Sequence, residues 1–128
     1  MILNTDGMKP IYVQISEWLE NEILNGNFKS DQKMYSQYQL AEMFTINPAT
    51  AAKGLNILAE ENILYKKRGL GMFVTKQATE IILAKRKGQT LKRLIFEIVN
   101  EAKNLNIDEE ELIQMIQTAN KEIKGEGK

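Results

Sequence analysis

SQYQLAEMFTINPATAAKGLNILAE, residues 36–60, contains two helix-start signals in close succession. Ser36 is followed three residues later by Gln39, the spacing of a capping box, so we expect a short helix to begin there. Asn47 and Pro48 begin a longer helix, because asparagine caps helix N-termini and proline suits the first helical position. Only a short turn separates the two helices, and this pattern is typical of a helix-turn-helix.

Apolar side chains indicate which face of each helix is buried. The shorter helix is expected to run to residue 44 and to bury Leu40, Met43 and Phe44. The longer helix is expected to end near Asn62 and to bury Ala51, Leu55 and Leu58. A helix over residues 10–25 precedes them, ends before Gly26, and has an apolar residue at every fourth position: Ile11, Ile15, Leu19 and Ile23.

Two strand-like segments, residues 63–67 and 72–75, flank the glycine-rich turn Arg68–Gly71. This arrangement predicts a β-hairpin. Because an isolated hairpin is only marginally stable, it must pack on the helices. We therefore predict a mainly α fold of the α+β type, in which residues 1–76 form a winged helix-turn-helix with a small β-hairpin wing.

The pattern changes from Thr79 onward to a heptad seam, in which spacings of three and four residues alternate. Its members are Ile81, Ala84, Gly88, Leu91, Ile95, Ile98, Ala102 and Leu105. Asp108 is expected to cap a second helix, whose seam continues through Leu112, Ile116, Ala119 and Ile123. Residues 77–128 are thus predicted to form a tail of two helices.

One small subunit cannot bury such a seam, so we predict that the tail is a dimerisation region. The predicted interface residues are Ala84, Gly88, Leu91, Ile95, Ile98, Ala102, Leu105, Leu112, Ile116 and Ala119. Gly88 is costly inside a helix, and two explanations stay open. Either another backbone approaches closely at Gly88, or the helix breaks there and forms a flexible joint.

Composition excludes several classes of function. The 128 residues include no cysteine and no histidine, which excludes disulfides, zinc sites built on thiolate or imidazole, and Ser–His catalysis. No acid, base and nucleophile converge in the pattern, so we predict a protein that is not an enzyme and has no cofactor and no metal. The chain has no apolar run of membrane-helix length and no signal-peptide start, which predicts a cytoplasmic protein.

The net charge is zero, yet basic residues cluster locally. Residues 62–76 contain no acid and hold Lys66, Lys67, Arg68 and Lys76. Residues 85–93 also lack an acid and hold five Lys or Arg side chains. Such tracts favour contact with phosphates. For the second tract the default interpretation is a solvated helix face, and a position near the DNA backbone is the alternative.

Residues 10–74 resemble the GntR family of bacterial transcription regulators. The matching residues, in order, are Pro10-Ile11-Tyr12-Val13-Gln14-Ile15, Gly26, Ser36 with Leu40-Ala41, Asn47-Pro48-Ala49-Thr50, and Arg68-Gly69-Leu70-Gly71-Met72-Phe73-Val74. The opening segment, the Asn-Pro-x-Thr motif and the short two-helix tail resemble the YtrA-type subgroup. This resemblance implies a DNA-binding regulator that lacks a large effector domain and dimerises through its C-terminal helices.

The chain departs from the family pattern at three places. Met34-Tyr35-Ser36 replaces the usual Leu-Pro-Ser, and Tyr38 stands where the family commonly has a DNA-contacting arginine. The wing has Gly69-Leu70-Gly71-Met72 in place of Gly-Arg-Gly-Thr. The operator sequence therefore does not carry over from the family.

The residues expected to bind DNA come from both helices and the wing. A recognition helix presents its first turns to the major groove, which selects Asn47, Thr50 and Lys53. Capping and phosphate contact are compatible for Asn47 and Ser36, while Tyr38 is either a phosphate or sugar contact or plain surface. From the wing we include Lys66, Lys67, Arg68, Gly69 and Gly71, with a solvated edge strand as the alternative for the basic residues.

The sequence thus predicts a transcriptional regulator, expected to be a repressor, that binds a double-stranded DNA operator as a homodimer. A small-molecule effector of unknown identity is a possible further partner, and the sequence leaves open whether one binds at all. The alternative is a winged-helix adaptor that contacts proteins without specific DNA binding. Salt-dependent binding to duplex DNA separates the two, because phosphate contacts release counterions.

Overall fold

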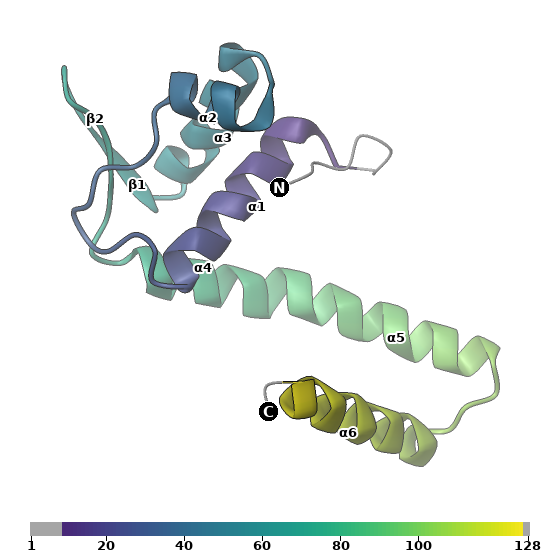
Figure 1. The fold of residues 1–128 in the computed structure, drawn as a ribbon. Coiled ribbons are helices and arrows are strands. Elements are labelled where there is room, and N and C mark those ends of the chain that lie inside the picture. Colours follow the sequence, from purple (N-terminus) through teal and green to yellow (C-terminus); the bar gives the residue numbers. More distant parts are fainter. Residues whose placement is uncertain (1–8, 127–128) are drawn as a thin grey trace. The chain divides into compact units, whose positions relative to one another are not determined.

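The computed structural model describes residues 9–126, which divide into two compact units (Figure 1). The first unit ends at Lys85 and the second begins at Arg86. The sequence placed this division after residue 76. The difference arises because helix α4 (Ala78–Lys85) packs on α1 of the first unit, where Ala78 and Ile82 are fully buried.

The first unit is a winged helix-turn-helix, which confirms the predicted fold class. Its other elements are α1 (Ile11–Leu24), α2 (Gln37–Phe44), α3 (Pro48–Glu60), β1 (Leu64–Lys67) and β2 (Gly71–Val74). The predicted capping box is present, because Ser36 Oγ accepts from the Gln39 N–H at 3.1 Å and the Ser36 N–H donates to Gln39 Oε1 at 2.8 Å. Asn47 Oδ1 accepts from the Ala49 N–H at 2.8 Å and caps α3.

The core lies where α1, α2, α3 and the hairpin meet. The predicted inward residues of α3, Ala51, Leu55 and Leu58, are buried. Gly54 is also buried, and a Cβ at this position would lie 3.0 Å from the Tyr12 carbonyl oxygen, so α1 and α3 pack backbone to backbone there.

The prediction that Met43 is buried was wrong, because its side chain is 46% exposed. The face of α2 that meets the core is formed by Leu40, Ala41 and, in part, Phe44. At 3.6 residues per turn, Met43 lies about a quarter-turn away from the centre of that face.

The hairpin pairs Leu64 with Val74 and Lys67 with Gly71 in antiparallel register. A third segment, residues 31–34, runs along the free edge of β2. The Met34 N–H donates to the Met72 carbonyl at 2.8 Å, and the Val74 N–H donates to the Gln32 carbonyl at 3.0 Å. Residues 31–34 therefore brace the wing along the free edge of β2.

The second unit contains η1 (Arg86–Leu91), α5 (Lys92–Asn104) and α6 (Glu109–Glu126). Gly88 lies in η1, a π-helical turn, so the helix widens at this position and does not break. Asp108 Oδ1 accepts from the Glu111 N–H at 2.9 Å, which confirms the predicted cap of α6. Within residues 9–126, no helix combines the length and the apolar character needed to cross a bilayer.

Candidate nucleic-acid interface

Asn47, Thr50 and Lys53 lie at the start of α3, and none of the three is buried. Asn47 and Lys53 are exposed, and Thr50 is half-buried. The side-chain oxygen of Asn47 accepts the hydrogen bond of the cap, while the side-chain amide N–H groups stay available as donors. The start of α3 therefore offers hydrogen-bond donors and one cation, which suit base edges and phosphates.

Lys53 rests on an aromatic ring of the neighbouring helix. Its Nζ atom lies 5.6 Å from the centroid of the Tyr12 ring in α1, within the range of a cation–π contact. The contact holds the long side chain beside the helix, so the ammonium would lose less conformational freedom on binding an anion such as phosphate. The sequence did not predict this role for Tyr12, because the pair is joined only by the packing of α1 on α3.

At the start of α2, Ser36 and Tyr38 face different environments. Ser36 is half-buried and its Oγ accepts the hydrogen bond of the cap, whereas Tyr38 is 70% exposed. The Ser36 hydroxyl proton and the Tyr38 hydroxyl are both donors that suit a phosphate oxygen.

The wing carries a basic tip on a rigid base. Lys66, Lys67 and Arg68 are all exposed, and Gly69 and Gly71 have φ values of +78° and +112° that favour glycine. On the outward face, Tyr65 stacks on Phe73 with ring centroids 5.8 Å apart. Lys67 Nζ lies 4.7 Å from the Phe73 centroid, so this ammonium is directed along the aromatic pair.

Two further contacts fix the wing to the preceding loop. The Tyr65 hydroxyl donates to Asp31 Oδ1 at 2.8 Å, and this hydrogen bond, followed by burial and the negative charge, raises the pKa of Tyr65. The backbone of Lys33 forms an isolated antiparallel β-bridge with Phe73. The side chain of Lys33 adds a cation to the basic wing, since its Cε atom lies 3.2 Å from the position that a Cβ on Gly71 would take. Lys33 is a candidate DNA contact that the sequence missed, because it is far from the hairpin along the chain.

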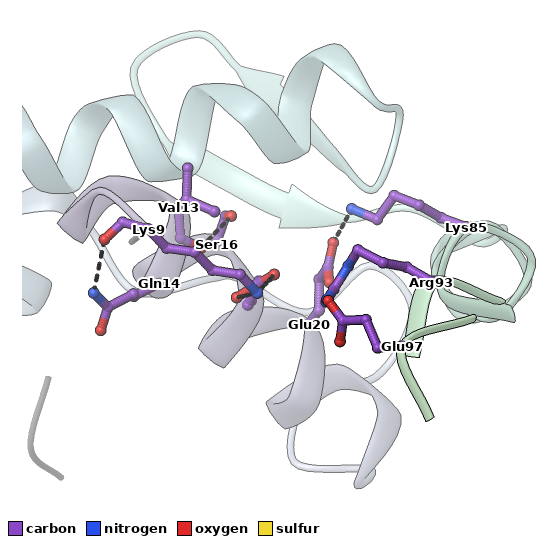
Figure 2. Close-up of polar contacts among 9 residues, drawn as sticks. Lys9, Val13, Gln14, Ser16, Glu20, Lys85, Arg93 and Glu97 are labelled. Atoms are coloured by element: carbon purple, nitrogen blue, oxygen red, sulfur yellow. Dashed lines mark hydrogen bonds and ion pairs between the residues drawn. The ribbon is translucent and has the colours of Figure 1, made fainter. Parts of the chain in front are cut away.

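The second basic tract is not simply a solvated face, because two carboxylates hold Lys85, and Figure 2 shows its contact with one of them, Glu20. Lys85 contacts Glu20, which is buried, and Glu61 at 2.8 Å. Burial acts to lower the pKa of Lys85, but the hydrogen bonds to Glu20 and Glu61 outweigh it and leave that pKa raised. In the second unit, Arg93 pairs with Glu97 at 3.0 Å.

The predicted sites thus divide between the units. All ten predicted DNA-binding residues belong to the first unit, as does Ala84 of the predicted interface. The rest of that interface lies in the second unit, where Leu91, Ile95, Ile98, Leu105 and Ile116 are 45–60% exposed. Ala102 is already buried, and Leu112 half-buried, beside a cavity of about 350 Å³ that α5 and α6 line.

Several known proteins are similar to this chain. The transcriptional repressor NagR of Bacillus subtilis is 38% identical over 80 residues, which are 62% of this chain and 33% of NagR. This chain therefore spans about a third of that relative's length. The repressor YtrA of the same species is 28% identical over 116 residues, which are 91% of this chain and 88% of YtrA.

Solved structures of transcription regulators are also similar to this chain. A GntR family transcriptional regulator from Listeria monocytogenes has a TM-score of 0.73 and 29% identity, and the match covers 88% of this chain and 97% of that one. The DNA-binding domain of AraR, solved in complex with operator ORR3, has a TM-score of 0.52 and 29% identity over 59% of this chain and 90% of that one. The family described as bacterial regulatory proteins, gntR family, matches residues 11–74, half of the chain. The chain belongs to the GntR family of bacterial regulatory proteins.

Proposed function

We propose that this DNA-binding transcription regulator acts as a homodimeric repressor that occupies a DNA operator. One observation carries the proposal. The recognition helix α3, with its capped start, and the basic wing, which residues 31–34 support through hydrogen bonds, belong to the same compact unit. The two relatives named as repressors, and the AraR domain solved with its operator, support this direction of regulation and this ligand.

In this mechanism, the first turns of α3 enter a major groove. Thr50 and Asn47 meet base edges or sugar–phosphate groups, and Lys53 neutralises a phosphate. The basic wing binds the neighbouring backbone or minor groove. A protein seated in this way blocks access to a promoter, which is the simplest form of repression.

The homodimer is supported by the apolar face of the tail. Leu91 at the end of η1 and Ile95 and Ile98 of α5 are each about half exposed in the single chain. Exposure of such side chains in a row is costly in water and marks a contact surface. Two subunits joined through their tails would present two recognition helices to half-sites about one helical turn, roughly 34 Å, apart.

The remaining parts of the proposal concern location and effectors. A cytoplasmic location follows from the proposed target, which is bacterial promoter DNA. A small-molecule effector stays a prediction from the sequence, and the apolar cavity between α5 and α6 is where we would test its binding. The adaptor alternative is less favoured, because it does not explain why donors and cations gather on α3 and the wing.

The test begins with selection of bound duplexes from a random DNA pool. We expect one enriched sequence with two related halves, and affinity that falls as salt rises because several phosphate contacts release counterions. Binding that is equal for every duplex would contradict sequence-specific regulation. Absence of any salt-dependent binding would favour the adaptor.

A further inference from the structure

The tip of the wing exposes one large apolar side chain, Leu70. Leu70 lies in the turn between the strands and its side chain is 60% exposed, whereas the apolar residues of β1 and β2 are buried or half-buried. Leu70 therefore contributes little to the core, and the structure of the hairpin does not require a leucine at this position.

The backbone at the tip is tightly constrained. The Leu70 N–H donates to the Lys67 carbonyl at 2.9 Å, which closes a four-residue turn. Gly69, at the third position of this turn, has a φ of +78°, a value that type II turns require there. The turn, and the positive φ of Gly71 that follows it, fix the point from which the leucine side chain projects.

The tip is also held in place from below. Residues 31–34 bond along β2, and Tyr65 both stacks on Phe73 and donates to Asp31. A preorganised tip of this kind loses little conformational entropy when it contacts a ligand. The leucine is therefore presented on a rigid support.

Several cations lie near the leucine in the hairpin. Lys66, Lys67 and Arg68 precede the Gly69-Leu70 tip in the sequence, and the Lys33 side chain lies against Gly71, which follows Leu70. These charges attract the two phosphate backbones that border a DNA groove. A leucine cannot bind phosphate, but it can pack on the apolar sugar walls and on the edge of a base step between those backbones.

We infer that Leu70 is a specificity-determining residue that inserts as an apolar wedge into the minor groove next to the major groove that α3 enters. Apolar side chains inserted in this way partly unstack a base step, and pyrimidine–purine steps unstack most easily. Leu70 thereby selects a flexible TA or CA/TG step in the flank of each half-site. This inference rests on the proposed function and adds a base preference to it.

The test compares Leu70→Ala, Leu70→Asn and Leu70→Met with the wild type on the selected duplex and on a duplex whose flanking flexible steps are replaced by stiff A-tracts. For the wild type we expect weaker binding to the stiff duplex. Leu70→Ala and Leu70→Asn should lose about tenfold in affinity on the selected duplex and discriminate poorly between the two, because the apolar contact is gone. Leu70→Met should retain most of the preference.

Two readouts separate a wedge from a general defect. The salt slope of Leu70→Ala should equal that of the wild type, because leucine neutralises no phosphate. A fluorescent base analogue at the flexible step should brighten on binding of the wild type and stay dark with Leu70→Ala. Leu83→Ala, which removes an exposed leucine of α4, is the matched control and should behave as the wild type.

Three results would overturn the inference. One is unchanged affinity and step preference in Leu70→Ala, which would make Leu70 an exposed leucine only. Another is weaker binding to every duplex with a reduced salt slope, which would indicate a displaced basic tip. If the wild type itself shows no salt-dependent binding to DNA, the proposed function is wrong, and this inference, which rests on it, is wrong as well.

Discussion

Lys53 and Thr50 lie one helical turn apart on the exposed side of α3, yet they are expected to act differently. We expect the ammonium of Lys53 to meet a phosphate, which every DNA sequence offers, and the hydroxyl of Thr50 to meet a base edge or make another sequence-dependent contact. Lys53→Ala should therefore weaken binding to all duplexes and reduce the salt slope by about 1. Thr50→Ala should cost about 1–3 kcal/mol mainly on the selected duplex.

Equilibrium titrations at several salt concentrations measure both effects. Lys121→Ala removes an exposed lysine of α6 in the second unit and is the control for lost charge. If both α3 variants bind as the wild type does, the DNA-binding face of the molecule lies elsewhere.

The hydrogen bond from Tyr65 to Asp31 predicts a pH dependence of the wing. Because the pKa of Tyr65 is raised in the folded protein, its contribution to stability is present below the ordinary tyrosine pKa and is lost as pH rises through the raised value. Asp31→Asn keeps an acceptor oxygen but removes the charge, so the pKa of Tyr65 should fall toward its ordinary range. Asp31→Ala, which also removes the acceptor, should lower it further.

Ring-labelled tyrosine NMR over alkaline pH follows this titration, with Tyr65→Phe to assign the signal. Glu42→Gln neutralises an exposed carboxylate on α2 and should leave the titration unchanged. A Tyr65 pKa that is the same in the wild type and in both Asp31 variants would mean that the hydrogen bond does not persist in solution.

At the scale of elements, Lys85 fastens the end of α4 to α1 and to the end of α3. Lys85→Met removes the ammonium that the buried Glu20 carboxylate contacts, so this carboxylate stays buried with less compensating positive charge. We expect the free energy of unfolding to fall by about 2–3 kcal/mol, less than the ~3–5 kcal/mol of a fully buried pair because Lys85 keeps some contact with solvent.

Chemical denaturation measures this loss. The Glu20→Leu, Lys85→Met double variant should recover much of the stability, since an apolar pair avoids the desolvation cost of charge. Lys87→Met, at an exposed position two residues further on, should change stability by less than about 0.5 kcal/mol. Equal stability of Lys85→Met and the wild type would show that the ionic cluster is not maintained.

At the scale of the whole molecule, the exposed apolar face of α5 predicts assembly. Ile98 is 45% exposed in the single chain, so Ile98→Asp should leave the subunit folded but place an uncompensated charge in the proposed interface. We expect monomers in sedimentation experiments. Specific DNA affinity should fall steeply, because a monomer cannot engage two half-sites at once.

Asn100→Asp adds the same charge on the other side of α5 and serves as the control. It should remain dimeric and bind DNA as the wild type does. If Ile98→Asp stays dimeric, the subunits associate through another surface.

Local signals in the sequence determined much of this protein. The capping box at Ser36, the Asn47-Pro48 start and the glycine turn of the hairpin depend on residues only a few positions apart, and each forms as expected. Hydrophobic periodicity located the buried face of α3 for the same reason. Such features predict the elements and therefore the fold class.

Tertiary structure alone decided which distant residues meet. Lys53 rests on Tyr12, Lys33 joins the wing, and Lys85 closes an ionic cluster with Glu20 and Glu61. The continuation of the first unit to Lys85 belongs to the same group, because it depends on the packing of α4 on α1. None of these contacts leaves a periodic trace in the chain, because each depends on the packing of one element against another and not on the spacing of residues along either.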